Sequence, residues 1–466
     1  MMSQQLLTFA YIAVILAVFY FDRNKEARTS KALWIPVMWL MINGSRPVSM
    51  WFQSGPTLGN EYADGSPLDA AIFGALIVAG LITVNFRWKK LGGMLRNNSA
   101  LLVFIAYCLA STLWSDYSLV SFKRWIKSVG DVIMVVIVLT EPDQRNAIKR
   151  FLCRVGYVVI PVSILFIKYY PDWGRSYNQW TWTPEYSGVT TFKNMLGMIT
   201  LVCALGVLWS FFTTWRDRPA RRWHHLVAQG IVLGMAAWIF HIANSMTSLS
   251  CFILASFVMI MANLAWIHRR PAFVHVLVAG VTAVSVVALF FDSSGGMVQS
   301  LGRNASLSGR TDLWRIVLEL SKPRALLGAG FETFWMGDRL ATVWRFEPGI
   351  QEAHNGYLEV YANLGWVGVI LLAAVIVTGY RNVLATYTRD RTLGSIKIAY
   401  FATSIIYSLT EAGFRMMSPV WLGFLLAVIY VPSMRVKKKV APKRRTIAAK
   451  QRELYPALAS SYRDSS

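Results

Sequence analysis

His354 is a residue type that can accept and donate protons, and its sequence neighbours suit it to that chemistry. It lies in the sequence Ala-His-Asn-Gly-Tyr-Leu, residues 353–358, which ends a long polar stretch, residues 292–356, in an otherwise apolar chain. Asn355 can cap the helix that follows, and the dipole of that helix disfavours an imidazolium at its N-terminus. We therefore expect a neutral ring near pH 7 and assign His354 as a general base. The alternative is a structural histidine that caps the helix or pairs with Glu352.

Arg310 lies in the same polar stretch and suits an anion. Residues 309–314, Gly-Arg-Thr-Asp-Leu-Trp, open a helical pattern with Thr311 as the expected N-cap. The N-terminus of a helix attracts anions through its free N–H groups, and a guanidinium adds bidentate hydrogen bonds to phosphate oxygens. Arg310 is thus predicted to bind a phosphate group. One apolar stripe of this helix is expected to be buried, formed by Leu313, Ile316, Val317 and Leu320.

The chain as a whole has the composition of a membrane protein. Hydrophobic residues make up 55% of its 466 residues, charged residues only 15%, and the mean hydropathy is +0.43. Soluble proteins carry about a quarter charged residues. The four cysteines lie in apolar runs without Cys-x-x-Cys spacing, which argues against a disulfide framework and a zinc site. We expect neither a metal nor a cofactor.

Thirteen apolar segments approach the length of about 20 residues that a helix needs to cross a bilayer. The sequence therefore predicts an all-α polytopic integral membrane protein with about 12 or 13 transmembrane helices, ten of them in residues 1–291 and three in residues 357–433. The first segment has no cleavage site after it and is expected to remain as a helix. The segments are residues 4–21, 33–50, 68–86, 100–115, 125–140, 151–169, 189–213, 226–243, 247–267, 272–291, 357–379, 397–412 and 416–433.

Lysine and arginine gather in alternate connections between these segments, which indicates the cytoplasmic side. Residues 292–356 belong to the other set and are predicted to form one large periplasmic loop, whereas residues 434–466 form a basic cytoplasmic tail. The formal net charge of +23 is explained by these loops and this tail, where basic residues attract anionic lipid headgroups. Nucleic-acid binding is disfavoured because no recognition element accompanies the charge.

Two motifs, one inside the polar stretch and one that begins at its end, resemble those of the O-antigen ligase superfamily. The first is Gly-Arg-Thr-Asp-Leu-Trp at residues 309–314. The second is His354-Asn355, followed after nine residues by Gly-Trp-Val-Gly at 365–368. Residues 188–197 look like the family's basic-Asn segment, with Lys193 where many ligases have arginine. Arg303 also fits the family's Arg-x3-Leu pattern, but Arg310 has the better context at a helix start. The two glycines, 365 and 368, are expected to allow close packing against a neighbouring span.

The resemblance implies a membrane glycosyltransferase fold of the GT-C type and metal-independent, inverting glycosyl transfer at the bacterial inner membrane. The donor would be an undecaprenyl diphosphate-linked glycan and the acceptor a glycan or a lipid-linked glycan, with the lipid bilayer and other polysaccharide assembly and export proteins as further partners. Cations that face the leaving diphosphate would lower the activation barrier of the glycosyl transfer. Beside the catalytic residues His354 and Arg310, the predicted substrate-binding residues are Lys193, Arg175, Arg124, Arg303 and Asn355.

Three classes of function stay open at this point. The first is a polysaccharide polymerase, which we favour, or an O-antigen ligase that acts on lipid A-core. The second is a polysaccharide transporter or flippase, although corresponding halves with broken spans are not evident. The third is a non-catalytic scaffold of envelope assembly, which leaves the pairing of Arg310 with His354 unexplained. Glu411 and Arg415, in the last outward turn, could pair with each other or line the path of the glycan.

Overall fold

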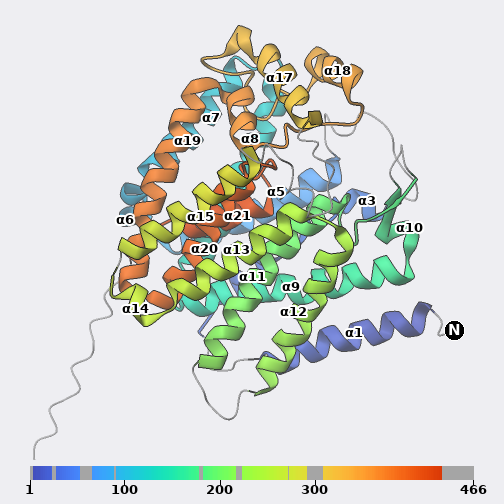
Figure 1. Ribbon diagram of the computed structural model, residues 1–466, viewed down its shortest axis with the longest axis vertical. Helices are drawn as coiled ribbons and strands as arrows, with labels where there is room; N and C mark the ends of the chain where they lie inside the picture. The colour runs from blue at the N-terminus through green and yellow to red at the C-terminus, as the bar shows by residue number, and fades with distance from the viewer. Residues whose placement is uncertain are drawn as a thin grey trace, which may run out of the picture. The chain divides into compact units, whose positions relative to one another are not determined.

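Helices dominate the computed structural model, which describes residues 4–23, 28–52, 66–88, 91–177, 182–216, 223–270, 272–290 and 308–432 (Figure 1). The sheet in this part of the chain is a single hairpin of β1 (Arg175–Tyr177) and β2 (Pro184–Tyr186), paired antiparallel with Ser176 opposite Glu185. Residues up to Val431 form one unit. The predicted basic tail, residues 434–466, lies outside the described residues.

Apolar helices of membrane-crossing length account for much of the bundle. Those that are long enough by length and composition are α1 (Gln4–Phe21), α5 (Pro67–Asn85), α9 (Gln144–Tyr169), α11 (Lys193–Arg216), α12 (Trp223–Ala243) and α19 (Gly356–Arg389). Shorter apolar helices are α2 (Trp34–Asn43) after the 3-10 turn η1 (Lys31–Leu33), α7 (Ser99–Ala110) with η3 (Ser111–Leu113), α13 (Met246–Ala262), α15 (Ala272–Phe290) and α21 (Pro419–Val428).

Further helices complete the described part of the bundle. They are α8 (Ser118–Leu139) and α20 (Arg391–Tyr407), with the short helices α3 (Val48–Phe52), α6 (Leu91–Asn97), α10 (Pro171–Gly174) and α14 (Ala265–His268). Each predicted apolar segment contains a helix, which confirms an all-α, multi-pass membrane protein. The predicted number of crossings stays a prediction.

The buried core lies among α9, α11, α20 and α21, whose residues are mostly inaccessible. In contrast, α1 and α5 keep large apolar side chains exposed, such as Phe9 at 68% and Leu81 at 51%. Lipid tails are as apolar as these side chains, so such faces are stable against hydrocarbon. The core therefore holds the central helices in place while the outer helices face the bilayer.

A buried carboxylate fixes the loop between α20 and α21 to this core. Asp131 of α8 accepts hydrogen bonds from the indole of Trp39 at 2.8 Å and from the backbone N–H of Met417 at 2.9 Å. Met417 has a positive φ of 61°, an uncommon conformation for a residue with a side chain. Because an unpaired buried carboxylate is costly, this pair of bonds specifies where the loop lies. The loop carries Glu411 and Arg415.

The predicted large loop forms a separate layer at one end of the bundle. Its described part contains α17 (Ser308–Ser321), η5 (Lys322–Arg324) and α18 (Gly337–Phe346), which Figure 1 shows at the top, above α19, α7 and α8. The predicted apolar stripe of α17 is confirmed, since Leu313 and Val317 are buried in a small hydrophobic cluster with Phe334. The helix starts at Ser308, so the predicted N-cap at Thr311 is wrong and Arg310 lies inside the first turn.

A break in α19 joins this layer to the bundle. Gly365 has φ 64° and ψ −167°, a conformation open almost only to glycine, and a Cβ there would lie 2.3 Å from the carbonyl oxygen of Leu326. The N–H groups of Trp366 and Val367, freed by the break, donate to the carbonyls of Ala325 and Leu326 at 2.9 and 3.2 Å. The expected reason for this glycine was therefore wrong. Gly365 lets a loop, rather than a neighbouring span, approach the helix.

The nearest neighbour of Gly368 also differs from the one expected. A Cβ on Gly368 would lie 2.2 Å from the Cβ of Leu364, one turn earlier in the same helix. The expected packing of Gly368 against another span is thus wrong. Both glycines belong to the kink, which sets the direction of the first turns of α19 and hence the position of the residues just before it.

Gly365→Ala is expected to destabilise the protein by about 1 to 3 kcal/mol, because alanine cannot adopt this backbone conformation without strain. The apparent melting temperature in detergent measures the effect. Gly280→Ala in α15 is the matched control, since a Cβ there meets nothing within 4 Å. Equal melting temperatures for the two variants would show that the break tolerates a side chain.

Candidate active site

His354 lies in the turn that precedes α19. Its φ of 48° is in the left-handed region, and 24% of its side chain is exposed. The predicted cap is confirmed, because the Asn355 side-chain oxygen accepts from the N–H groups of Tyr357 and Leu358, both at 3.0 Å. The amide nitrogen of Asn355 donates to the carbonyl of Leu409 at 3.2 Å. Asn355 thus fixes the turn that holds His354 beside the loop after α20.

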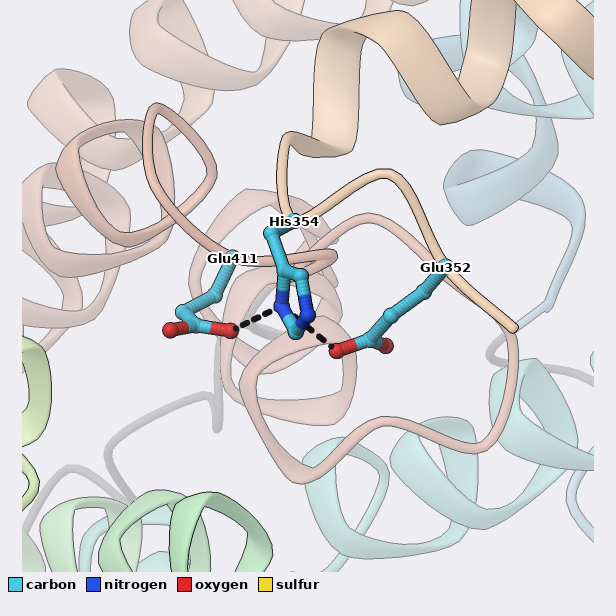
Figure 2. A group of neighbouring side chains, drawn as sticks. All are labelled: Glu352, His354 and Glu411. Atoms are coloured by element: carbon cyan, nitrogen blue, oxygen red, sulfur yellow. Dashed lines mark hydrogen bonds and ion pairs between the residues drawn. The ribbon is translucent and has the colours of Figure 1, made fainter. Parts of the chain in front are cut away.

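Two carboxylates flank the ring of His354. Its Nδ1 atom lies 3.0 Å from Glu411 and 3.1 Å from Glu352, and Figure 2 shows the ring between them. Burial by itself lowers the pKa of His354, but the hydrogen bonds and negative charges of Glu352 and Glu411 outweigh burial and raise it to about 10. The expected neutral ring is therefore wrong. The helix dipole does disfavour an imidazolium, but the two carboxylates in contact with the ring have the larger effect on its pKa. The ring is therefore an imidazolium at neutral pH.

Glu411 also contacts Arg310. One of its oxygens accepts from Arg310 at 3.1 Å while the other faces His354, and a second Arg310 nitrogen donates to the carbonyl of Thr410 at 2.6 Å. The Arg310 side chain is 19% exposed and that of Glu411 only 5%. The fold thus brings the two predicted catalytic residues together on one buried carboxylate. Arg310 reaches it from the first turn of α17.

The charges continue beyond His354 with alternating sign. Arg415 donates to the carboxylate of Glu332 at 3.0 Å and lies 3.6 Å from Glu352, so it does not pair with Glu411. Burial lowers the pKa of Arg415, but Glu332, Glu359 and Glu352 outweigh it and raise that pKa. Glu332 has a φ of 58°. We call the row the charge row; its members, in order, are Arg310, Glu411, His354, Glu352, Arg415 and Glu332.

The other predicted substrate-binding residues occupy three different places. Arg124 donates to the backbone carbonyl of Glu332 and thus lies next to the charge row. Lys193, at the start of α11, pairs with Glu185 at 2.7 Å and keeps 37% of its side chain exposed. Arg175 donates to the carbonyl of Ile167 at 2.9 Å and lies over the ring of Tyr186. Arg303 lies outside the described residues.

The start of α11 is linked to the charge row through α13. A Cβ on Gly197 would lie 2.7 Å from Ser245 and Ser248, which shows how closely the two helix starts pack. The hydroxyl of Thr247 is 3.5 Å from that of Thr410, the residue whose carbonyl binds Arg310. Lys193 therefore begins a helix that packs beside the site, although its own ion pair is with Glu185.

The same cluster has the donor atoms of a metal site. One atom each from Glu352, His354 and Glu411 lie within 4.8 Å of one another. However, Arg310 contacts Glu411 and Arg415 lies near Glu352, and the Nδ1 atom of His354 lies against both carboxylates. Guanidinium groups and an imidazolium thus already face the negative charges of these carboxylates.

A family model described as O-antigen ligase matches residues 235–373. That range contains Arg310, Glu352 and His354 together with the broken start of α19. This part of the chain is thus similar to the O-antigen ligase family. The chain is also similar to the exopolysaccharide production protein ExoQ of Rhizobium meliloti (strain 1021), with 24% identity over 314 residues that cover 64% of this chain and 68% of the relative. These findings support a role in polysaccharide biosynthesis.

The site holds further candidate residues that sequence reasoning did not assign. Glu411 was noted with Arg415 as a polar pair in an outward turn, but its partners were not. Glu332, which binds Arg415, was not among the candidate residues. The available signal was a charged residue at the end of an apolar segment, which is rare unless it has a partner or a function.

Proposed function

We propose that this protein polymerises undecaprenyl diphosphate-linked oligosaccharide units on the periplasmic face of the bacterial inner membrane. The observation that carries the proposal is the contact of Glu411 with both Arg310 and His354. A guanidinium and an imidazolium held at one place suit a leaving group that gains negative charge. The similarity to a protein named for exopolysaccharide production favours a polymer as the product, whereas the family description favours an O-antigen ligase.

The charges support a metal-independent, inverting transfer. A hydroxyl of the acceptor glycan attacks the anomeric carbon of the donor, and the bond from that carbon to the diphosphate oxygen breaks, with its electron pair remaining on the diphosphate. Arg310 and the imidazolium of His354 stabilise this negative charge, and Lys193 is a further candidate. His354 is thus proposed as a hydrogen-bond donor, in place of the general base expected from the sequence, because its raised pKa leaves no free lone pair on the ring.

The proton of the acceptor hydroxyl needs a different base, for which we propose Glu352. Burial raises the pKa of Glu352, but its hydrogen bond to His354 and the charges of His354, Arg415 and Arg310 lower it below the usual value. The carboxylate is therefore ionised at neutral pH. Its side chain is 24% exposed, compared with 5% for Glu411, so an acceptor can approach it. A carboxylate can accept this proton because the attacking hydroxyl becomes much more acidic in the transition state.

The orientation of the chain belongs to the same proposal. The layer with α17 and α18 faces the periplasm, where lipid-linked donors are presented, and the C-terminal tail lies in the cytoplasm. A glycan acceptor, the bilayer and other polysaccharide assembly and export proteins are the proposed partners. A cysteine placed at the exposed Arg345 of α18 should react with a membrane-impermeant thiol reagent in intact spheroplasts.

Purified protein incubated with an undecaprenyl diphosphate-linked oligosaccharide tests the function. We expect longer lipid-linked chains in the presence of EDTA, since no step requires a metal ion. Transfer of the glycan to added lipid A-core instead would identify a ligase. A transporter or a scaffold would form neither product, and that result would contradict the proposal. His354→Ala is the control that excludes a contaminating enzyme.

The pH dependence of this reaction reports the working state of His354. The ring is charged below its folded pKa of about 10, and its ordinary pKa is about 6.5. The stability gained from pairing the imidazolium is complete below about pH 6.5 and is lost as the pH rises through about 10. We expect the transfer rate to hold up to about pH 9 and to fall above it. The residual transfer rate of His354→Ala should show no such fall above about pH 9. A rate that rises between about pH 8 and about pH 10 would identify the neutral ring as the active form.

A further inference from the structure

Ala353, the residue between Glu352 and His354, is held by two side chains that are not part of the charge row. It is fully buried. Its N–H donates to a carboxylate oxygen of Glu359 at 2.5 Å, and its carbonyl accepts from the indole N–H of Trp314 at 2.8 Å. The backbone between the proposed base and the proposed imidazolium donor is therefore fixed at both of its polar groups.

Glu359 is the centre of a small buried network in the first turn of α19. Its carboxylate oxygens accept from the indole of Trp335 at 3.0 and 2.9 Å and from the amide of Asn363 at 3.4 Å. The side-chain oxygen of Asn363 in turn accepts from the N–H of Phe334 at 3.0 Å. A buried carboxylate is costly unless donors surround it, so these bonds specify one position for the side chain. Glu359 thus ties the segment before α18 to the turn before α19.

Trp314 comes from the helix that also carries Arg310. The two residues are four positions apart on α17, so their side chains leave the same face of the helix. Arg310 reaches Glu411, while Trp314 binds the carbonyl of Ala353. One turn of one helix therefore contacts both the buried carboxylate of the charge row and the turn that carries His354.

We propose that Glu359 and Trp314 are positioning residues, which hold the backbone of Ala353 so that its two neighbours face the substrate. This role rests on the proposed function, in which Glu352 and His354 act on the acceptor and the donor. The left-handed φ of 48° at His354 shows why such support is needed. A residue with a side chain keeps that conformation only where its surroundings impose it.

Two conservative variants loosen the turn without touching the charge row. Trp314→Phe removes the indole N–H, and Glu359→Gln keeps the size of the side chain but replaces one acceptor oxygen with an NH2 group. A displacement of about 1 Å at a reacting centre can cost about 100-fold in rate, so we expect each variant to lower kcat at least about tenfold. KM for an undecaprenyl diphosphate-linked donor should stay within about twofold, because neither side chain is proposed to bind it.

Trp209→Phe is the matched control for the loss of a buried hydrogen bond. Trp209 is 1% exposed, and its indole donates to the carbonyl of Thr392 at 2.9 Å, at the start of α20. Glu411 follows the other end of that helix. The control should leave kcat unchanged even if its melting temperature falls. An equal loss of kcat in Trp209→Phe and Trp314→Phe, or an unchanged kcat in Glu359→Gln, would overturn the inference.

The protonation of His354 provides a readout that a merely structural role would not move. Its ring faces Glu352 from the same turn and Glu411 from the loop after α20, and Arg415 and Arg310 lie on the far sides of these carboxylates. A looser turn weakens the contacts of Nδ1 with both carboxylates. The pKa of His354, about 10 in the wild type, should therefore fall in both positioning variants.

Diethyl pyrocarbonate measures this pKa without turnover, because it acylates the neutral imidazole. The extent of modification of His354, followed by mass spectrometry from about pH 6 to about pH 10, should have a midpoint lower by about 1 in Trp314→Phe and Glu359→Gln. The midpoint should be unchanged in Trp209→Phe. Equal midpoints in the wild type and the two positioning variants would overturn the inference. A lowered midpoint without any glycan product from the wild type would support the positioning and contradict the proposed function alone.

Discussion

Replacing His354 with alanine is expected to lower the rate of glycan transfer by about 10²- to 10³-fold, the usual effect of losing one donor to a developing negative charge. The loss has two causes. The imidazolium no longer faces the leaving diphosphate, and Glu352 and Glu411 lose the cation that both contact at Nδ1. Their charges then repel the anionic donor. Product formed by purified protein, with equal amounts of wild type and variant in the membrane, measures the effect.

Two further variants show whether charge is the property that matters. His354→Lys keeps a cation and should recover part of the lost rate, whereas His354→Gln keeps only hydrogen-bonding groups and should not. His275→Ala is the matched control, because His275 bonds to Tyr380 at 2.9 Å and is not in the charge row. Near-normal polysaccharide from His354→Ala would end the proposed role of this residue.

Arg310→Ala is expected to reduce kcat/KM by about 10²- to 10³-fold, with an increase in KM for the donor, because the guanidinium would bind the diphosphate in both the ground state and the transition state. The variant also leaves one oxygen of Glu411 without its partner in a nearly inaccessible place. Arg310→Lys should recover only part of the loss, since an ammonium group cannot replace the planar, two-point contact of a guanidinium.

A neighbouring arginine on the same helix provides the control for this experiment. Arg315 pairs with Asp312 at 2.7 Å and keeps 74% of its side chain exposed, so Arg315→Ala removes an equal charge from α17 without touching Glu411. Its kcat/KM should stay within about twofold of the wild type, because exposed ion pairs contribute little. Equal losses from Arg310→Ala and Arg315→Ala would mean that α17 contributes only general positive charge.

Local patterns were sufficient for the helices and for two residues of the site. The apolar segments follow from hydropathy, which depends on neighbouring residues alone, and each of them contains a helix. Arg310 and His354 were assigned from short motifs, and the structure places both against Glu411. The cap at Asn355 was equally local, since it needs only the residue type and the two N–H groups that follow.

The contacts of Glu411 could not be predicted in this way. Glu411 is 57 residues from His354 and 101 from Arg310, and nothing in those separations indicates that a turn after α20 returns to the start of α19. For the same reason the expected charge of His354 was wrong. The sequence indicated the helix dipole, but it did not indicate the two carboxylates that lie against Nδ1. Tertiary contacts dominate wherever ionisable groups meet across elements.

The start of α17 and the break at Gly365 show that backbone features, too, can depend on contacts that local sequence patterns do not contain. Residues 309–314 were expected to open a helix capped at Thr311, yet α17 already begins at Ser308. Arg310, in that first turn, is held by the carbonyl of Thr410, a contact that no helix signal contains. Gly365 was recognised as a close-packing position, but its partner proved to be the loop at Leu326.

The most direct test of the account is the transfer rate of purified Glu411→Gln with an undecaprenyl diphosphate-linked oligosaccharide. Glutamine keeps the size of the side chain but removes the charge that Arg310 and His354 share, so we expect wild-type protein to lengthen the glycan and the variant to do so at least about 100-fold more slowly. The pKa of His354 should fall in the variant, which moves the alkaline loss of rate to lower pH. Equal rates and equal pH profiles for wild type and Glu411→Gln would show that glycan transfer takes place elsewhere in the protein.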